Sequence, residues 1–187
     1  MLQKTAARLS EALSMTGNES DWSKARAKAA GPPDRSSRFD AVAETMATAR
    51  RRNRETEKGG CGCPILVEGK RDRVVFRSLG YTGPIELYNR GWDMSRLCAW
   101  LYETYGTRNL IDGSSSIIVV MDWDRTGGRL QRELCRRLES MDMQIDSNLR
   151  KQLGRFLNQE TSTVEGMKGS VNELKMRIDL IDFTEEE

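Results

Sequence analysis

The feature that most constrains the fold is a regular alternation of short apolar runs and longer amphipathic segments after residue 64. Apolar runs lie at 65–67 and 117–121, and weaker runs, each interrupted by a polar residue, lie at 85–88 and 143–145. Fully apolar strands that alternate with helices of about 10–13 residues predict a parallel sheet that is buried on both faces. Right-handed crossovers then place helices on both sides of a sheet of about four strands, which is an α/β fold.

The helices expected between these strands follow from apolar residues at helical spacing and from capping signals. One helix is expected at 72–79, and Asp93 is expected to cap a second one that ends near Tyr105. A third helix carries Leu130, Leu134 and Leu138 at intervals of four residues. Two polar helices, near 147–157 and 170–181, are expected to complete the chain.

Residues 1–60 have a different pattern, which predicts a helical N-terminal appendage. A short amphipathic helix is expected at 2–13, and a second helix is expected from about residue 37 to residue 57. Four apolar residues form the expected inner face of this second helix: Phe39, Val42, Ala43 and Met46. The glycine- and cysteine-rich run at 58–64 predicts a linker. The sequence is therefore divided into an appendage with its linker at 1–60 and a domain at 61–187.

Charge is spread unevenly along the chain. The net charge of the whole chain is only +2, yet residues 1–60 hold 12 Lys and Arg against 8 Asp and Glu. Four arginines gather at the end of the second predicted helix: Arg50, Arg51, Arg52 and Arg54. A basic helix suits an acidic partner such as nucleic acid, and the alternative is a solvated helix surface. The N-terminal helices are also a candidate contact for a partner protein.

Several classes of protein and of site are excluded by what the sequence lacks. The chain has no histidine, so Ser-His-Asp and Cys-His catalysis and histidine-based metal sites are ruled out within it. Its four cysteines are too few for a disulfide scaffold, and the pair Cys61 and Cys63 has neither the usual spacing nor a second pair for structural zinc. Without a long apolar segment, neither membrane insertion nor secretion is expected, and a cytoplasmic location follows.

Acidic residues stand at the ends of two predicted strands. Glu68 follows the run 65–67, and Asp122 and Asp124 follow the run 117–121. The carboxyl ends of parallel strands meet at one edge of the sheet, where ligands bind in open α/β folds. Asp122 and Asp124 are two residues apart, so they can project to the same side and repel each other unless a proton or a cation lies between them. A hard divalent cation, Mg²⁺ or Mn²⁺, fits such a site.

Basic residues and glycines lie beside the same acids. Lys70, Arg71 and Arg125 are candidate contacts for the oxygens of a phosphate group. Gly69 allows a close backbone approach after the first strand. Gly127 begins the helix after the third strand, whose N-terminal amides favour anions. Alternatively, Lys70 and Arg71 are solvated surface charges.

Two motifs together resemble the Toprim domain, which topoisomerases, bacterial-type primases, OLD-family nucleases and an RNA maturase share. They are Glu68-Gly-Lys70-x-Asp72 after one strand and Asp122-x-Asp124 after a later one, and the resemblance covers about residues 64–145. It implies a Rossmann-like Toprim fold most similar to the small, stand-alone Toprim proteins. It also implies that Glu68 acts as a general acid or base, with Lys70 at a further motif position. Asp122 and Asp124 would hold Mg²⁺, and we expect Glu68 to complete the metal set.

The function expected from this resemblance is Mg²⁺-dependent cleavage or transfer of phosphodiesters in RNA or DNA, most simply by a small nuclease. The chain has no room for the tyrosine-bearing gate of a topoisomerase or for the modules of a full primase. One alternative is a non-catalytic nucleic-acid-binding or assembly subunit that uses the basic helix at Arg50–Arg54. Another is a phosphatase of the haloacid dehalogenase type with Asp122 as nucleophile, which leaves Glu68 unexplained.

Overall fold

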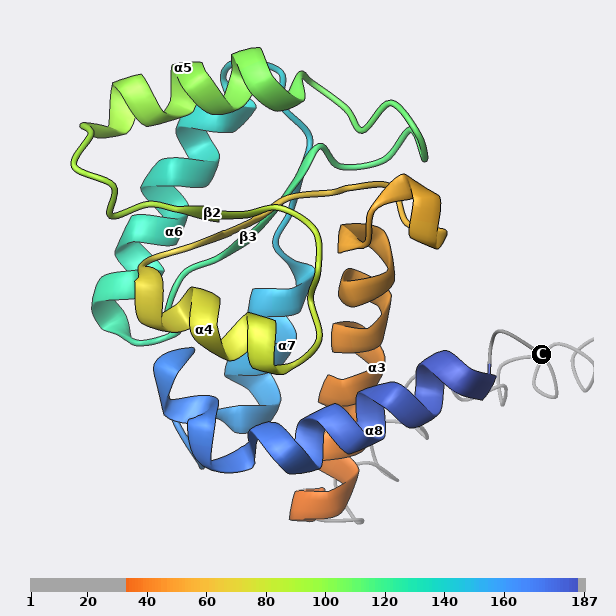
Figure 1. The fold of residues 1–187 in the computed structure, drawn as a ribbon. Helices are drawn as coiled ribbons and strands as arrows, with labels where there is room; N and C mark the ends of the chain where they lie inside the picture. Colours follow the sequence, from red (N-terminus) through yellow and green to blue (C-terminus); the bar gives the residue numbers. More distant parts are fainter. Residues whose placement is uncertain (1–32, 185–187) are drawn as a thin grey trace, which may run out of the picture. The chain divides into compact units, whose positions relative to one another are not determined.

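The computed structural model describes residues 33–184, which contain a four-stranded sheet (Figure 1). Its strands are β1 (Ile65–Val67), β2 (Ile85–Leu87), β3 (Ile117–Val120) and β4 (Ile145–Asp146). The strand order is β2-β1-β3-β4, and every neighbouring pair is parallel. The expected α/β class, with its all-parallel four-stranded sheet, is therefore confirmed.

Helices fill the connections that the sequence pattern assigns to them. They are α3 (Arg35–Asn53), α4 (Lys70–Ser78), α5 (Met94–Tyr105), α6 (Arg125–Glu139), α7 (Asn148–Leu157) and α8 (Val171–Thr184), with short 3-10 turns at η1 (Thr56–Lys58) and η2 (Glu165–Ser170). Asp93 caps α5 as expected, because its carboxylate accepts a hydrogen bond of 2.9 Å from the amide of Arg96. Local sequence signals thus set most of the helix positions.

The sheet separates two hydrophobic cores because successive strand residues face opposite sides. In β1, Ile65 and Val67 face the core formed with α3, α4, α7 and α8. Leu66 faces the other core, which α5 and α6 cover through residues such as Leu97 and Leu134. Figure 1 shows these two groups of helices on either side of the strands. This arrangement leaves the carboxyl ends of the strands uncovered as a site for ligands.

Helix α3 belongs to the folded domain, which corrects the expected boundary at residue 61. Its predicted inner face is buried completely, and the residues Phe39, Val42, Ala43 and Met46 lie in the core beneath the sheet. The compact unit that contains the sheet accordingly begins at Ser36. An apolar helix face contributes more to the free energy of folding when it is buried in a large core than when it stays in a small appendage.

The end of α3 and the glycine-rich run after it also differ from expectation. The helix ends at Asn53 rather than near residue 57, and Asn53 is fully buried. Its side chain donates to the carbonyls of Cys63 and Pro84, both at 2.9 Å, and accepts from the amide of Gly83 at 3.0 Å. The run 58–64 is therefore a hydrogen-bonded segment and not a loose linker, because the amides of Cys61 and Cys63 both donate to Arg52.

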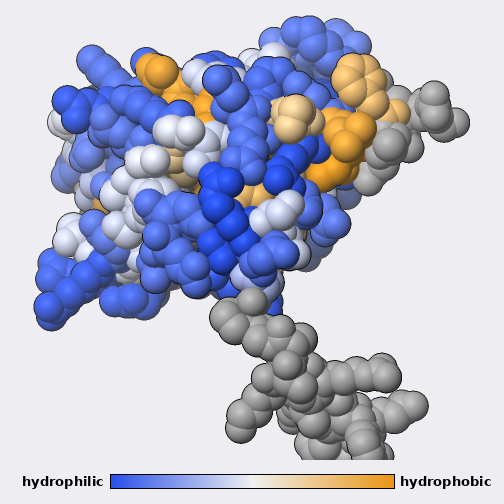
Figure 2. Space-filling view, turned by 90° about the horizontal axis from the view of Figure 1, so that it is seen from below, coloured by the Kyte–Doolittle hydropathy of each residue, from blue (hydrophilic) through white to orange (hydrophobic). Residues whose placement is uncertain are grey.

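Helix α8 keeps an apolar stripe on its outer side. Met176, Leu180 and Phe183 are spaced by four and three residues and are 66%, 66% and 71% exposed. Figure 2 views the molecule from the side on which α8 lies and shows apolar surface within a largely hydrophilic exterior. Within residues 33–184, no helix is long and apolar enough to cross a membrane. The helix expected at 2–13 lies outside the described residues.

Candidate active site

The two acidic motifs meet at one edge of the sheet because their strands are direct neighbours. Val67 of β1 pairs with Val120 of β3, so the chain leaves both strands at the same level. Glu68 lies one residue beyond β1, and its Oε1 accepts a hydrogen bond of 3.2 Å from the backbone amide of Asp122. Two motifs that lie 54 residues apart are thereby brought together.

Backbone amides fix one oxygen of each aspartate. Oδ1 of Asp122 accepts from the amide of Val164 at 2.7 Å, and Oδ1 of Asp124 accepts from the amide of Gly127 at 2.7 Å, which caps α6. The second carboxylate oxygens of Glu68, Asp122 and Asp124 have no hydrogen-bond partner between residues 33 and 184. These three oxygens therefore remain available to a ligand.

The approach of α6 to the third strand requires a glycine. A Cβ atom on Gly127 would lie 2.2 Å from the carbonyl oxygen of Asp122, which is far inside van der Waals contact. Any larger residue would push the start of α6 away from the loop that carries Asp122 and Asp124. Gly127 therefore holds the capped end of the helix against the candidate site.

Burial and mutual repulsion favour the protonated forms of two of these acids. Burial raises the pKa of Glu68, and the charge of Asp122 raises it further, against the opposing hydrogen bond from the Asp122 amide. Burial also raises the pKa of Asp122, and the charges of Asp72 and Asp124 add to that shift. A carboxyl group whose pKa is raised toward neutrality is suited to general acid–base chemistry.

The structure does not bring Glu68, Asp122 and Asp124 together as the expected compact set of three metal ligands. Among residues 33–184, no three His, Cys, Asp or Glu side chains are grouped closely enough to hold a metal ion between them. Mg²⁺ does not need such a group, because it keeps several waters and binds through one or two carboxylates plus substrate phosphate. Glu68 and Asp122 meet this smaller requirement, and a cation would relieve the repulsion that raises both of their pKa values.

A hollow of about 470 Å³ lies over these acids. Its lining combines the first motif, Asp122 and a later segment, and comprises Glu68, Gly69, Lys70, Arg71, Asp72, Asn89, Asp122, Thr163 and Glu165. Lys70 is exposed, whereas Arg71 forms an ion pair of 3.3 Å with Glu165 while remaining 78% exposed. Asp72 instead accepts from the amide of Gly69 at 2.8 Å, so it stabilises the start of α4. Asp124 and the exposed Arg125 lie outside the hollow.

Several residues of the site carry no signal in the sequence. Arg150 of α7 donates to the carbonyl of Met121 at 3.1 Å and to that of Asp122 at 2.8 Å. The indole nitrogen of Trp123 donates to the carbonyl of Thr161 at 2.7 Å, so this ring anchors the loop between α7 and η2. That loop carries Val164 to its contact with Asp122. These contacts join segments about 30 to 40 residues apart, which no local motif reveals.

The arginines at the end of α3, which the sequence offers as nucleic-acid contacts, form ion pairs within the domain. Arg50 is only 5% exposed, and it donates to Asp182 at 3.0 Å and to Asp179 at 2.7 Å. Arg51 and Arg54 also form ion pairs with Asp182. These arginines are therefore paired with acids inside the domain, where they join the end of α3 to α8.

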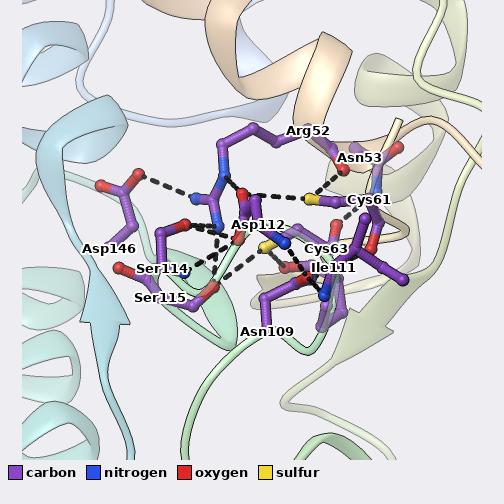
Figure 3. Close-up of polar contacts among 11 residues, drawn as sticks. Arg52, Asn53, Cys61, Cys63, Asn109, Ile111, Asp112, Ser114, Ser115 and Asp146 are labelled. Atoms are coloured by element: carbon purple, nitrogen blue, oxygen red, sulfur yellow. Dashed lines mark hydrogen bonds and ion pairs between the residues drawn. The ribbon is translucent and has the colours of Figure 1, made fainter. Parts of the chain in front are cut away.

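Arg52 organises a separate polar cluster at the opposite edge of the sheet (Figure 3). Its guanidinium group donates to Asp112 at 2.8 Å and lies 3.6 Å from Asp146. Cys61 contacts the same Asp112 through its sulfur at 3.3 Å. Burial raises the pKa of Cys63 to about 12, so its thiol stays protonated at neutral pH. The cluster accordingly ties the run 58–64 to α3 and to the loop before β3, and it gives no support to a structural zinc site.

Comparison with known proteins relates the chain to one named family. No family model matches the chain. A UPF0292 protein of Thermococcus onnurineus is 32% identical over 105 residues, which are 56% of this chain and 71% of the relative. A UPF0292 protein of Methanosarcina barkeri is 27% identical over 124 residues, which are 65% of this chain and 78% of the relative. Among solved structures, a protein from Aquifex aeolicus aligns over 72% of this chain and 98% of its own, with 19% identity and a TM-score of 0.46. On the identity and coverage of the Thermococcus relative, the chain belongs to the UPF0292 protein family.

Proposed function

We propose that this protein is a Toprim-type, Mg²⁺- or Mn²⁺-dependent enzyme that cleaves or transfers phosphodiesters in nucleic acid. The observation that carries the proposal is the pairing of Glu68 with the backbone of Asp122 beneath a hollow that Lys70 and Arg71 also line. A proton-transfer group at Glu68, a cation ligand at Asp122 and positive charge for a phosphate thus share one pocket. The resemblance of both motifs to Toprim domains supports the same assignment.

Each residue has a distinct part in the proposed reaction. Glu68 holds or takes up the proton at the oxygen that leaves or attacks, for which its raised pKa is suited. Asp122, with Asp124 beside it, would hold the cation, and a bound cation would supply charge stabilisation on the phosphate. Lys70 and Arg71 orient the phosphate through charge-assisted hydrogen bonds.

Cleavage assays with end-labelled RNA and DNA test this proposal directly. The proteins compared are the wild type, Glu68→Gln and Asp122→Asn, each with Mg²⁺, Mn²⁺ or a chelator. We expect the wild type to cut with either metal and the Glu68→Gln protein to cut roughly 100-fold to 10,000-fold more slowly, the usual contribution of a general acid or base. Glu103→Gln is the matched control, because Glu103 is an exposed carboxylate on α5.

The outcomes separate the proposal from its alternatives. Cutting that persists in chelator, or that is equal in wild type and Glu68→Gln, would overturn the assigned roles. Binding of nucleic acid without cutting, equal in the wild-type and Asp122→Asn proteins, would instead establish a binding or assembly module. Thermal unfolding of each variant verifies that the loss of activity is not a loss of folded protein.

A further inference from the structure

Helix α6 carries a stripe of arginines that begins beside the candidate active site. Arg125, Arg129, Arg132 and Arg136 are spaced by four, three and four residues, so they lie along one side of the helix. At 1.5 Å per residue, the stripe is about 16 Å long. Its first member directly follows Asp124, which caps the helix.

Three of these arginines are not neutralised by the fold. Arg125, Arg129 and Arg132 are exposed and form no ion pair or side-chain hydrogen bond with any residue from 33 to 184. Only Arg136 has an acidic partner, Glu133, at 3.1 Å. Like charges one turn apart oppose helix formation, and positive charge near a helix N-terminus opposes the helix dipole. Such an arrangement has a cost in stability that binding of a polyanion would offset.

The stripe borders a groove of about 640 Å³. Tyr88, Met94 and Leu130 line it as apolar or aromatic residues, and Arg129 and Arg132 line it as cations. The remaining lining residues are Thr126, Glu133 and Arg136. An apolar and aromatic surface next to unpaired guanidinium groups suits unstacked nucleobases next to their phosphates.

The groove lies beside the hollow that contains the acids. Tyr88 of the groove directly precedes Asn89 of the hollow. Arg132 and Arg150 approach the same side of Gly128, within 3.7 and 3.3 Å of the point where a Cβ atom would lie. Arg150 in turn donates to the carbonyl of Asp122 at 2.8 Å. Positive charge therefore extends from the backbone of the candidate site to the groove along α6.

We infer that the groove along α6 binds a single strand of nucleic acid and leads it to the hollow over Glu68 and Asp122. This inference rests on the proposed function, since it names the form of substrate that the same site accepts. Arg129 and Arg132 contact successive phosphates, and Tyr88 stacks with a base. A base-paired duplex keeps its bases stacked inside, so it cannot use the aromatic part of the groove.

Binding of fluorescent oligonucleotides in chelator tests the groove without any cutting. The probes are single strands of RNA and of DNA and the matching duplexes, with the salt concentration varied. We expect the Arg129→Ala/Arg132→Ala protein to bind single strands about tenfold more weakly or worse, because two phosphate contacts are lost. The slope of log affinity against log salt should fall by about 1.4, at about 0.7 per phosphate on a single strand.

The matched control is Arg108→Ala/Arg155→Ala, which removes the same charge from exposed arginines in the loop before β3 and in α7. Equal losses in both double variants, or tighter binding of duplex than of single strand by the wild type, would overturn the inference. If Tyr88→Leu leaves the affinity for single strands unchanged, Tyr88 does not stack with a base and that part of the inference is wrong. If the groove binds single strands but the protein shows no metal-dependent cutting, the proposed function is wrong and the groove assignment stands. If the protein cuts and the groove variants bind normally, the groove assignment is wrong and the proposed function stands.

Discussion

Two helix segments of this protein are rich in arginine but have opposite environments. At the end of α3, Arg50 and Arg52 are paired with aspartates, and Arg50 is almost completely buried. Along α6, Arg125, Arg129 and Arg132 are exposed and form no ion pair within residues 33–184. A run of arginines in a sequence therefore does not by itself identify a surface that binds nucleic acid.

The difference arises from acidic residues that are distant in sequence. Asp179 and Asp182 of α8 lie about 130 residues beyond Arg50, and Asp112 lies 60 residues beyond Arg52. Within residues 33–184, no acidic side chain pairs with Arg125, Arg129 or Arg132, and the last two line a groove. Where the fold supplies counter-charges the arginines stabilise it, and where it supplies none they are available to a ligand.

The largest effect on stability is expected for substitution of Arg50. Arg50→Ala should lower the free energy of unfolding by about 3 kcal/mol, because Asp182 loses its most buried partner and keeps only the partly exposed Arg51 and Arg54. Urea unfolding at neutral pH measures this change. Arg51→Ala is the control, since Arg51 is 29% exposed and lies 3.4 Å from the same aspartate, and its loss should cost less than about 1 kcal/mol. Equal effects of the two substitutions would contradict the structural role of Arg50.

An intermediate effect is expected for acid stability, through the cluster around Arg52. Burial disfavours the charged form of Asp112, but hydrogen bonds from Arg52 and Ser114 outweigh it and lower the pKa of Asp112 below its ordinary value. Because the folded-state pKa is lower than the unfolded value of about 3.9, the stabilisation is present above that pH. It is lost as the pH falls below 3.9 toward the folded-state pKa.

The Asp112→Asn protein provides the test of that pH dependence. It should be less stable than the wild type by about 1 kcal/mol at pH 6, a modest value because Asp112 is 31% exposed. The difference should shrink as the pH falls toward 3. Urea unfolding across this range measures it, and a constant difference at all pH values would show that the charge of Asp112 does not contribute.

The smallest effect has the opposite sign and belongs to α6. Arg132→Ala should raise the free energy of unfolding by about 0.4 kcal/mol. It removes the repulsion of Arg132 with Arg129 and Arg136, and alanine has a higher helix propensity than arginine. It should also remove a repulsive charge next to Arg150, whose pKa is lowered by burial and further by the charge of Arg132. The gain should decrease in high salt. A loss of stability on this substitution would mean that Arg132 supports the fold as Arg50 does.

Much of the fold follows from residues close together in the sequence. Continuous apolar runs such as 117–121 predicted buried parallel strands, and the strands ended within one or two residues of the expected positions. Asp93 and the spacing of Leu134 and Leu138 predicted α5 and α6 in the same way. The position of Glu68 near Asp122 also followed, because parallel strands place their carboxyl ends at one edge.

Other features depend on contacts that only the folded chain creates. The amide of Val164 orients Asp122, and Arg150 binds the carbonyl of the same residue, yet neither lies in a motif. The burial of α3 against the sheet moved the domain boundary to Ser36, because its apolar face had a core to join.

The sequence by itself determined the elements of this protein and the edge of the sheet at which its acids gather, since periodicity and strand direction are local properties. Only the tertiary structure decided which arginines are paired with acids and which face a groove. The energy of a charged side chain depends on its partners and on its exposure to water. Both are set by segments that are distant in the chain.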